Sequence, residues 1–410
     1  MSDVSLFAAF RGERYADPAT LAARLAPPYD VISPPQREDL VARDPFNIVK
    51  VDLPVAGDGA DPYAAAATRL ADWRRRGVIV RDGEPCAYVL RTSGRFPDGA
   101  TRERTGVFLA VSAEPFSKGR VLPHERTHAK AKEDRRRLMH ATGANLSAVF
   151  LLAPDSSGAL TRALGDVTAR EPWARCTAIG SDQAVWVVRG KDAQRLAEAA
   201  GAEPVYVADG HHRFETSVMF RDEAPAAWRD GAARTLSHVV SFKDPGLVIL
   251  PTHRLLDGPP VDPAAFLSAA AACFAEAPAG VEPTLSVVFR GGREVALKVR
   301  ADAAWPASGG QPVHPAVRAL EVAAADVLAV GVAAASLLGG VPALRYTADA
   351  GEARAEGRAG RCACAVILPP TRLEAVRRVA DAGQIMPPKS TFFAPKVPTG
   401  VVLRPFDAPV

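Results

Sequence analysis

The stretch Val205-Tyr-Val-Ala-Asp-Gly-His-His-Arg-Phe-Glu-Thr-Ser217 contains three successive structural signals. Its first four residues are apolar and rich in β-branched side chains, which predicts a short buried strand. Asp209-Gly210 is a dipeptide typical of tight turns. The residues from Phe214 onward allow an amphipathic helix that ends before Pro225. The stretch therefore predicts a strand, a turn and the start of a helix, with His211, His212 and Arg213 at that start.

The first turn of a helix is a favourable place for an anion, because its backbone N–H groups and the positive end of the helix dipole face outward. Arg213 adds a planar charged fork that suits a phosphate or a carboxylate. The alternative is purely structural: Asp209 caps the helix, Gly210 supplies the turn and the histidines are surface residues. Three polar side chains directly after a buried strand favour a functional site.

Length and composition indicate the class of protein and the number of domains. The chain has 410 residues, 48% hydrophobic and 23% charged, which is typical of a globular protein with two or three domains. Its net charge of +4 gives no argument for nucleic-acid binding, so anion binding must be local. We expect a mixed α/β (α+β) fold with an N-terminal region, 1–255, that holds the site. A smaller C-terminal α/β region, 256–410, would have a tail that returns to it.

The N-terminus shows no signal peptide, and the longest apolar run, Val327–Leu338, is too short for a membrane span. Five scattered cysteines support neither a disulfide framework nor a structural zinc site. We therefore expect a cytoplasmic protein without membrane attachment. Its oligomeric state is left open.

Two prolines at each end enclose an early loop, Ala26-Pro-Pro-Tyr-Asp-Val-Ile-Ser-Pro-Pro35. Such a segment cannot be a helix or a central strand, so it is an ordered loop with Tyr29 and Asp30 at its centre. Many proline loops only connect elements. A carboxylate between apolar and aromatic residues is nevertheless a plausible catalytic or substrate-binding group. Further on, Ile48–Leu53 is predicted to be a strand.

His124-Glu125-Arg-Thr-His128 has the literal pattern of a zinc metalloprotease helix. That chemistry needs both histidines on one face of a helix that packs into the core, whereas the residues that follow are strongly charged. Three interpretations stay open: a zinc site, a solvated helix, or polar site residues at His124 and Glu125. His253 and Arg254 lie at the end of a predicted strand in the middle of the chain. Near the C-terminus, Lys389 and Ser390 lie among prolines and aromatic residues.

Several segments together resemble the motif set of a widespread bacterial and archaeal family of unknown function. They are Ala26-Pro-Pro-Tyr-Asp-Val-Ile-Ser33, Pro123-His-Glu-Arg-Thr127, Asp134-Arg135, Ala208-Asp-Gly-His-His-Arg213, Pro251-Thr-His-Arg254 and Met386-Pro-Pro-Lys-Ser-Thr391. Around Gly-His-His-Arg the family is similar to the ParB/sulfiredoxin superfamily and its free-serine kinases. In those proteins a related turn holds nucleotide phosphates.

The resemblance implies a ParB/sulfiredoxin-like nucleotide-binding core and a site for ATP or ADP with Mg²⁺. The nucleotide-binding residues would be Asp209, Gly210, His211, His212, Arg213 and Thr216. The catalytic candidates are Asp30, His212 and Glu125, with Asp30 as the nearest counterpart of the kinases' catalytic acid. The substrate-binding candidates are Tyr29, His124, His253, Arg254, Lys389 and Ser390. No residue is assigned to a metal.

The leading hypothesis is thus a nucleotide-dependent phosphotransferase that acts on a small hydroxyl compound, such as serine. The sequence has neither a Walker loop nor the glycine-rich loop of protein kinases, so it belongs to neither class. One alternative is a nucleotide-binding regulatory protein without turnover, as ParB-like switches are. The other is a zinc-dependent hydrolase that uses His124-Glu125-x-x-His128.

Overall fold

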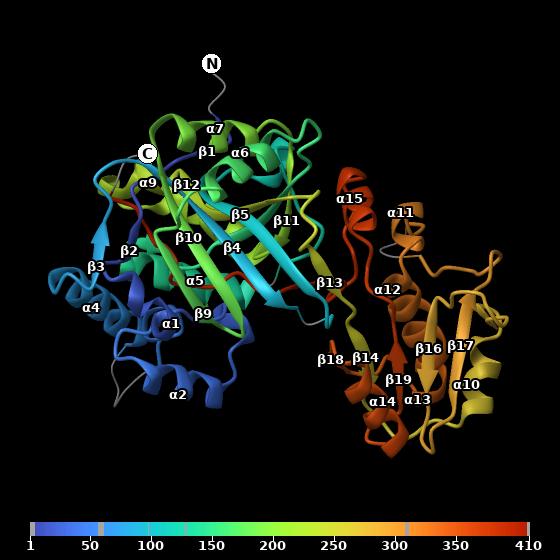
Figure 1. Ribbon diagram of the computed structural model, residues 1–410. Coiled ribbons are helices and arrows are strands. Elements are labelled where there is room, and N and C mark those ends of the chain that lie inside the picture. The colour runs from blue at the N-terminus through green and yellow to red at the C-terminus, as the bar shows by residue number, and fades with distance from the viewer. Residues whose placement is uncertain (1–4, 56–60, 97, 128, 308–310, 408–410) are drawn as a thin grey trace. The chain divides into compact units, whose positions relative to one another are not determined.

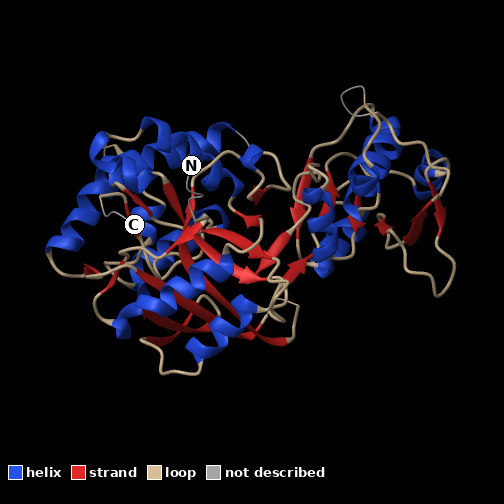
Figure 2. Cartoon of the chain, turned by 90° about the horizontal axis from the view of Figure 1, so that it is seen from above, coloured by secondary structure: helices blue, strands red, loops and turns tan. Residues whose placement is uncertain are grey.

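The computed structural model describes residues 5–55, 61–96, 98–127, 129–307 and 311–407, with the side chains of 129–131 left out. The chain forms two compact units, Met1–Val248 with Pro395–Val410, and Ile249–Ala394. In each unit the strands gather into sheets with helices around them (Figure 2). This mixed α/β architecture confirms the predicted fold class. The unit boundary lies a few residues before the predicted one, and the last residues belong with the first unit.

Among the described residues of the first unit, nine strands form one mixed sheet. The strand order is β6-β11-β8-β12-β5-β4-β10-β9, and β1 pairs with β5. These strands are β1 (Phe7–Ala8), β4 (Cys86–Arg95), β5 (Thr101–Ser112), β6 (Val121–Leu122), β8 (Val149–Ala153), β9 (Ala174–Ala178), β10 (Ser181–Arg189), β11 (Val205–Asp209) and β12 (Arg234–Ser241). Short strand pairs join β2 (Glu13–Tyr15) to β3 (Ile79–Arg81) and β7 (Ala144–Asn145) to β21 (Arg404–Pro405).

The helices of this unit surround the sheet (Figure 1). The α-helices are α1 (Leu21–Arg24), α2 (Pro34–Arg43), α3 (Val49–Asp52), α4 (Pro62–Arg75), α5 (Ala129–Thr142), α6 (Ala159–Thr168), α7 (Gly190–Ala200), α8 (His211–Glu223) and α9 (Arg229–Ala232). The 3-10 helices are η1 (Pro18–Thr20), η2 (Tyr29–Val31), η3 (Phe116–Lys118) and η4 (Ala226–Trp228).

The two faces of this sheet differ in chemistry. One face meets α6 and α7 in an apolar core that includes Val107, Leu151 and Val239. Because side chains alternate along a strand, Phe108, Phe150 and His238 point to the opposite face. That second face therefore carries buried aromatic and polar side chains near the end of β11.

The prediction of a strand at Ile48–Leu53 was wrong, since Val49–Asp52 is the short helix α3. Asn47 explains the difference: its side-chain oxygen accepts a hydrogen bond from Val49 N at 3.0 Å, which starts a helical turn. The segment is also buried, and burial rather than strand pairing accounts for its apolar residues. As a result Asp52 lies in the interior of the unit.

The second unit has its own sheet, in the order β15-β17-β16-β19-β14-β18. Its strands are β14 (His253–Leu256), β15 (Phe274–Glu276), β16 (Leu285–Val288), β17 (Glu294–Val299), β18 (Leu344–Thr347) and β19 (Cys364–Ile367), with β20 (Phe392–Ala394) outside that sheet. The strand β13 (Val248–Leu250) crosses the boundary between the units. The helices are α10 (Pro263–Ala270), α11 (Pro315–Arg318), α12 (Glu321–Ala323), the π-helix η5 (Ala324–Ala334), α13 (Ala335–Leu338), α14 (Ala350–Ala359) and α15 (Leu373–Asp381).

One helix in the described ranges, Glu321–Leu338, is long and apolar enough to cross a membrane by length and composition. The prediction that no apolar run reaches this length was wrong, because the helix begins at Glu321 rather than at Val327. Half of it is buried, and its buried residues belong to the apolar core of the second unit. Core helices of globular proteins pass the same test, so the helix is weak evidence for a membrane span.

Candidate functional site

The central turn, Asp209–Arg213, has the structure that the sequence predicted. The strand β11 ends at Asp209 and the helix α8 begins at His211. Gly210 joins them with φ +92°, a backbone conformation that side chains other than hydrogen disfavour. A Cβ atom there would lie 2.9 Å from Arg213 Nε, so glycine also lets the guanidinium fold back over the turn.

Arg213 is held in place from both sides. Its Nη2 donates to Asp209 Oδ2 at 2.9 Å, and its Nη1 donates to the backbone oxygen of Ala148. Asp209 has a second cation, because Lys396 Nζ from the C-terminal segment lies 3.3 Å from Oδ1. Burial opposes ionisation of Asp209, yet Lys396 and Arg213 hold its pKa well below the usual range. The turn is thus a preorganised cluster of one anion and two cations.

The proline loop comes to this turn although it lies far away in the sequence. Tyr29 and Asp30 belong to η2, and the Arg135 guanidinium stacks on the Tyr29 ring at 3.8 Å from its centroid. Burial raises the pKa of the Tyr29 hydroxyl to about 12, against the opposing charges of Arg213 and Arg135. Burial also disfavours the charged form of Arg213, but Asp209 and then Asp30 raise its pKa. Tyr29, Asp30 and Arg213 therefore form one electrostatic neighbourhood.

Asp52 is a residue of this neighbourhood that the sequence analysis missed. Arg135 Nη1 donates to its backbone oxygen at 2.8 Å and lies 3.3 Å from its Oδ1. Burial raises the pKa of the Asp52 carboxyl, although Arg135 and Arg213 lower it. Asp52, Arg135 and Arg213 line a cavity of about 30 Å³, which is large enough for a water molecule. Arg135 thus contacts both Tyr29 of the proline loop and the buried carboxylate of Asp52.

His124 and His211 form an interior pair. Both are buried, and their rings meet edge to face with centroids 4.7 Å apart. The Nε2 atom of His211 accepts a hydrogen bond from His124 N at 3.2 Å, so this nitrogen carries no proton. Burial, reinforced by His124, holds the pKa of His211 well below its usual value. Burial likewise lowers the pKa of His124 to about 4. Both imidazoles are therefore neutral, and their contact connects the segment before α5 to the central turn.

The zinc-protease interpretation was wrong about the local structure. Residues 124–127 form a bend and irregular backbone, and the helix α5 begins only at Ala129. His124 therefore does not lie on the helical face that the zinc motif requires. His128 lies outside the described residues. Within the described parts of the chain, no group of three or more potential metal-binding side chains occurs.

The other predicted residues of the first unit lie close to the turn in different settings. His212 is half-buried in the first turn of α8, and its backbone oxygen accepts from Thr216 Oγ1 at 2.7 Å. Thr216 is fully buried, so its hydroxyl serves the helix rather than the surface. Glu125 is half-buried in the bend after His124.

The neutral histidine pair predicts a pH-dependent stability. A group whose folded pKa is depressed contributes stability above its unfolded pKa, about 6.5 for histidine, and loses it as the pH falls. We expect the free energy of unfolding to decline between pH 6.5 and 5, by up to about 1.4 kcal/mol per pH unit for each such histidine. Chemical denaturation across this range measures the slope. His211→Gln keeps an acceptor for His124 N but cannot bind the proton, so its slope should be shallower. Equal slopes would contradict this account of His211.

The remaining predicted substrate residues belong to the second unit. Arg254 is completely buried, binds Asp326 with two hydrogen bonds of 2.8 and 3.1 Å, and donates to the backbone oxygen of Thr252. The Nδ1 atom of His253 accepts from Leu368 N at 3.1 Å. Ser390 Oγ donates to Pro387 O at 2.6 Å, and Lys389 is exposed with φ +55°. Apart from Lys389, these side chains stabilise the second unit itself.

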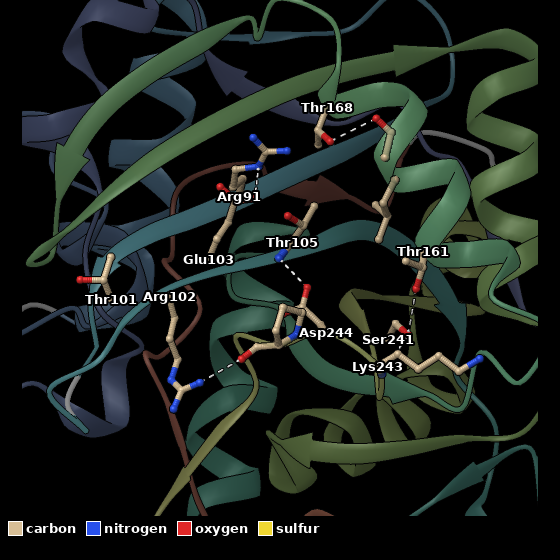
Figure 3. A pocket seen from close by; sticks show the side chains of 13 residues that line it. Arg91, Thr101, Arg102, Glu103, Thr105, Thr161, Thr168, Ser241, Lys243 and Asp244 are labelled. Atoms are coloured by element: carbon tan, nitrogen blue, oxygen red, sulfur yellow. Dashed lines mark hydrogen bonds and ion pairs between the residues drawn. The ribbon is translucent and has the colours of Figure 1, made fainter.

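A larger pocket of about 450 Å³ lies elsewhere in the first unit, between the β4–β5 hairpin and α6 (Figure 3). Its charged side chains are engaged with the protein. Arg91 pairs with Glu103 at 3.1 Å, and Asp244 Oδ2 accepts from Thr105 N at 2.9 Å. Lys243 Nζ donates to the backbone oxygen of Ser156 at 2.9 Å. These bonds hold the hairpin and the following loop together, and the central turn remains the stronger candidate site.

Comparison with solved structures finds distant likenesses. A conserved hypothetical protein from Pyrococcus furiosus is 15% identical with a TM-score of 0.37, over 74% of this chain and 96% of that one. A free serine kinase in complex with AMP is 14% identical with a TM-score of 0.36, over 72% and 92%. SbnI from Staphylococcus aureus is 10% identical with a TM-score of 0.36, over 72% and 81%. Likenesses this distant do not establish a shared activity.

No curated protein gives a significant match to the sequence. A protein-family model does match, over residues 7–323, which is well over half of the chain and includes the proline loop and the central turn. The chain therefore belongs to the family described as "Protein of unknown function (DUF1015)".

Proposed function

We propose that the protein is a nucleotide-dependent phosphotransferase whose acceptor is a small hydroxyl compound of the serine type. The observation that carries the proposal is the convergence of the proline loop on the central turn. It brings a carboxylate, Asp30, into the electrostatic neighbourhood of Arg213 at a helix start. Phosphoryl transfer needs these two elements: donors that stabilise phosphate charge, and a group that takes the proton of the attacking hydroxyl.

The central turn suits the phosphates of a nucleotide. Gly210 precedes the first turn of α8 and has no side chain that competes for the helix N–H groups. The Arg213 guanidinium and the Lys396 ammonium add positive charge beside it. The nucleotide would arrive as its Mg²⁺ complex, since Mg²⁺ is usually held by phosphates, waters and only one or two carboxylates. Its chemistry is to neutralise charge on the transferred group.

Asp30 is the best-placed base of the loop. Its side chain is exposed, whereas the Asp52 carboxylate is buried against Arg135 and the Tyr29 hydroxyl keeps its proton at neutral pH. In the proposed reaction Asp30 accepts the proton of the acceptor hydroxyl. The hydroxyl oxygen then forms a bond to the terminal phosphorus as the bond from phosphorus to the nucleotide breaks. His212 and Glu125 are proposed to contact the transferred phosphoryl group and the acceptor.

We propose that the reaction takes place in the cytoplasm. All five cysteines are free thiols, four of them buried, which is consistent with a reducing compartment.

A thermal-shift screen tests the nucleotide site. At a ligand concentration of about 100 times the dissociation constant, binding to the folded state adds about 2.7 kcal/mol, which raises the melting temperature by several degrees. We expect such a shift with ADP, ATP or CTP in the presence of Mg²⁺. Incubation with nucleotide and L-serine should then yield a phosphorylated product, detected by mass spectrometry. A shift without any product would favour a nucleotide-binding regulator, and no shift with any nucleotide would exclude the phosphotransferase.

A further inference from the structure

Arg104 is a buried charged residue that the proposed reaction does not yet use. It lies on β5 with 2% of its surface exposed, and its Nη1 and Nη2 atoms make no hydrogen bond within the described residues. Its guanidinium carbon is 5.1 Å from the centroid of the Phe150 ring. Burial lowers its pKa to about 10, which still leaves it charged at neutral pH. The charge of Asp244 partly offsets the effect of burial on this pKa, but a buried guanidinium whose two Nη atoms make no hydrogen bond within the described residues still costs stability.

A second unpaired group lies beside it. His238 on β12 is 1% exposed, and neither of its ring nitrogens has a hydrogen-bond partner among the residues that the structure describes. Its ring packs on Phe108 and Phe150, with centroids 4.6 and 5.8 Å away. Burial, and after it the charge of Arg104, holds the pKa of His238 well below its usual value. The neutral ring has one N–H that can donate.

Gly106 makes room for the His238 ring. It lies between Arg104 and Phe108 on the same face of β5, and a Cβ atom there would be 2.5 Å from Cε1 of His238. The absence of a side chain lets the imidazole lie flat against the strand.

The register of the sheet places these groups next to the central turn. Asp209 is paired with Phe150, Phe150 with His238, and His238 with Phe108. Neighbouring strands lie roughly 4.8 Å apart, so His238 is about 10 Å from Asp209 across the sheet. The Arg104 guanidinium carbon lies 5.1 Å from the ring centroid of Phe150, the residue that is paired with Asp209. The separation of His238 from Asp209 suits a molecule of a few carbon atoms.

We propose that Arg104 and His238 bind the carboxylate of the acceptor, which makes the substrate a small hydroxy acid or hydroxy amino acid. The inference rests on the proposed function, because it assigns the other end of that substrate. The arginine fork pairs with a carboxylate through two parallel hydrogen bonds, and the imidazole supplies a third donor. The aromatic surroundings exclude water and strengthen those bonds. The hydroxyl end of the same molecule then extends toward Asp209 and Arg213.

The test compares acceptors and variants of the full chain by calorimetric titration. The probes are L-serine, L-threonine, D-glycerate and L-lactate, with ethanolamine and glycerol as hydroxyl compounds that lack a carboxylate. The wild type should bind at least one of the four carboxylates, and neither ethanolamine nor glycerol. Arg104→Met should bind that carboxylate roughly tenfold more weakly or worse while it binds ADP as the wild type does. His238→Phe, which preserves an aromatic ring, should show the same selective loss.

Thermal stability separates a binding role from a structural one. Because methionine removes a buried guanidinium whose Nη1 and Nη2 atoms make no hydrogen bond within the described residues, Arg104→Met should melt at a higher temperature than the wild type in the absence of ligand. Arg102→Met is the matched control: Arg102 lies two residues earlier and pairs at the surface with Asp98 at 2.7 Å, so carboxylate binding should be unchanged. A lower melting temperature of Arg104→Met combined with unchanged carboxylate binding would overturn the proposal.

Failure of this proposal and failure of the proposed function have different signatures. A wild type that binds ADP but none of the four carboxylates overturns the carboxylate site alone. A wild type that binds a carboxylate through Arg104 but no nucleotide overturns the phosphotransferase alone.

Discussion

Replacing Asp30 by asparagine is expected to lower the rate of phosphoryl transfer by roughly a hundredfold or more, while nucleotide binding is retained. Asparagine has nearly the same shape but cannot accept the proton of the attacking hydroxyl. Asp30 is exposed in the proline loop, so the substitution disturbs no packing. The effect should therefore appear in kcat rather than in stability. The measurement is the steady-state rate of product formation, together with the dissociation constant of ADP.

Asp39 offers a matched control for this experiment. It is an exposed aspartate of α2, nine residues further along the chain, and Asp39→Asn should leave the rate unchanged. A rate for Asp30→Asn within a few-fold of the Asp39→Asn rate would remove Asp30 from the mechanism. Asp52→Asn would then be the next variant to examine, since Asp52 is a buried carboxylate of the same neighbourhood.

The sequence predicted the local parts of this site and missed the relations between distant parts. The strand, turn and helix of Val205–Ser217 follow from neighbouring residues, because a turn dipeptide and the change from an apolar run to a helical pattern are local properties. The electrostatic interaction of Asp30 with Arg213 depends on how the chain folds back after about 180 residues. No periodicity encodes such a return.

Two further features show the same limit. Asp52 was missed because it lies in an apolar segment whose sequence is compatible with either a strand or a buried helix. Only the packing of the segment decides between the two. His238, Phe150 and Asp209 are neighbours because of strand register, which the residues of a single strand do not specify. Conversely, the His124-to-His128 pattern predicted a zinc helix from sequence alone, and the backbone at 124–127 is not helical. Short polar motifs thus require their structural context.

The substitution Arg213→Met is expected to weaken nucleotide binding by about a hundredfold, which corresponds to about 2.7 kcal/mol. Charge-assisted hydrogen bonds to phosphate are worth about 1.5 to 3 kcal/mol each in such a setting, so loss of the fork accounts for an effect of this size. The variant should also be less stable by about 2 kcal/mol, because Asp209 keeps only Lys396 as a charged partner and the Ala148 oxygen loses its donor. Titration with ADP and Mg²⁺ below the melting temperature of the variant measures the affinity separately from stability.

Two further variants serve as controls for the measurement of ADP affinity. Arg221→Met makes the same change near the other end of α8, where Arg221 pairs with Asp222 and donates to Ala113 O at 2.8 Å, and it should bind ADP like the wild type. Arg213→Lys keeps the charge but not the planar fork, so its affinity should lie between those of Arg213→Met and the wild type. If Arg213→Met bound ADP as tightly as Arg221→Met, the central turn would not be the phosphate site. The buried ion pair of Arg213 and Asp209 would then serve only to fix the junction between β11 and α8.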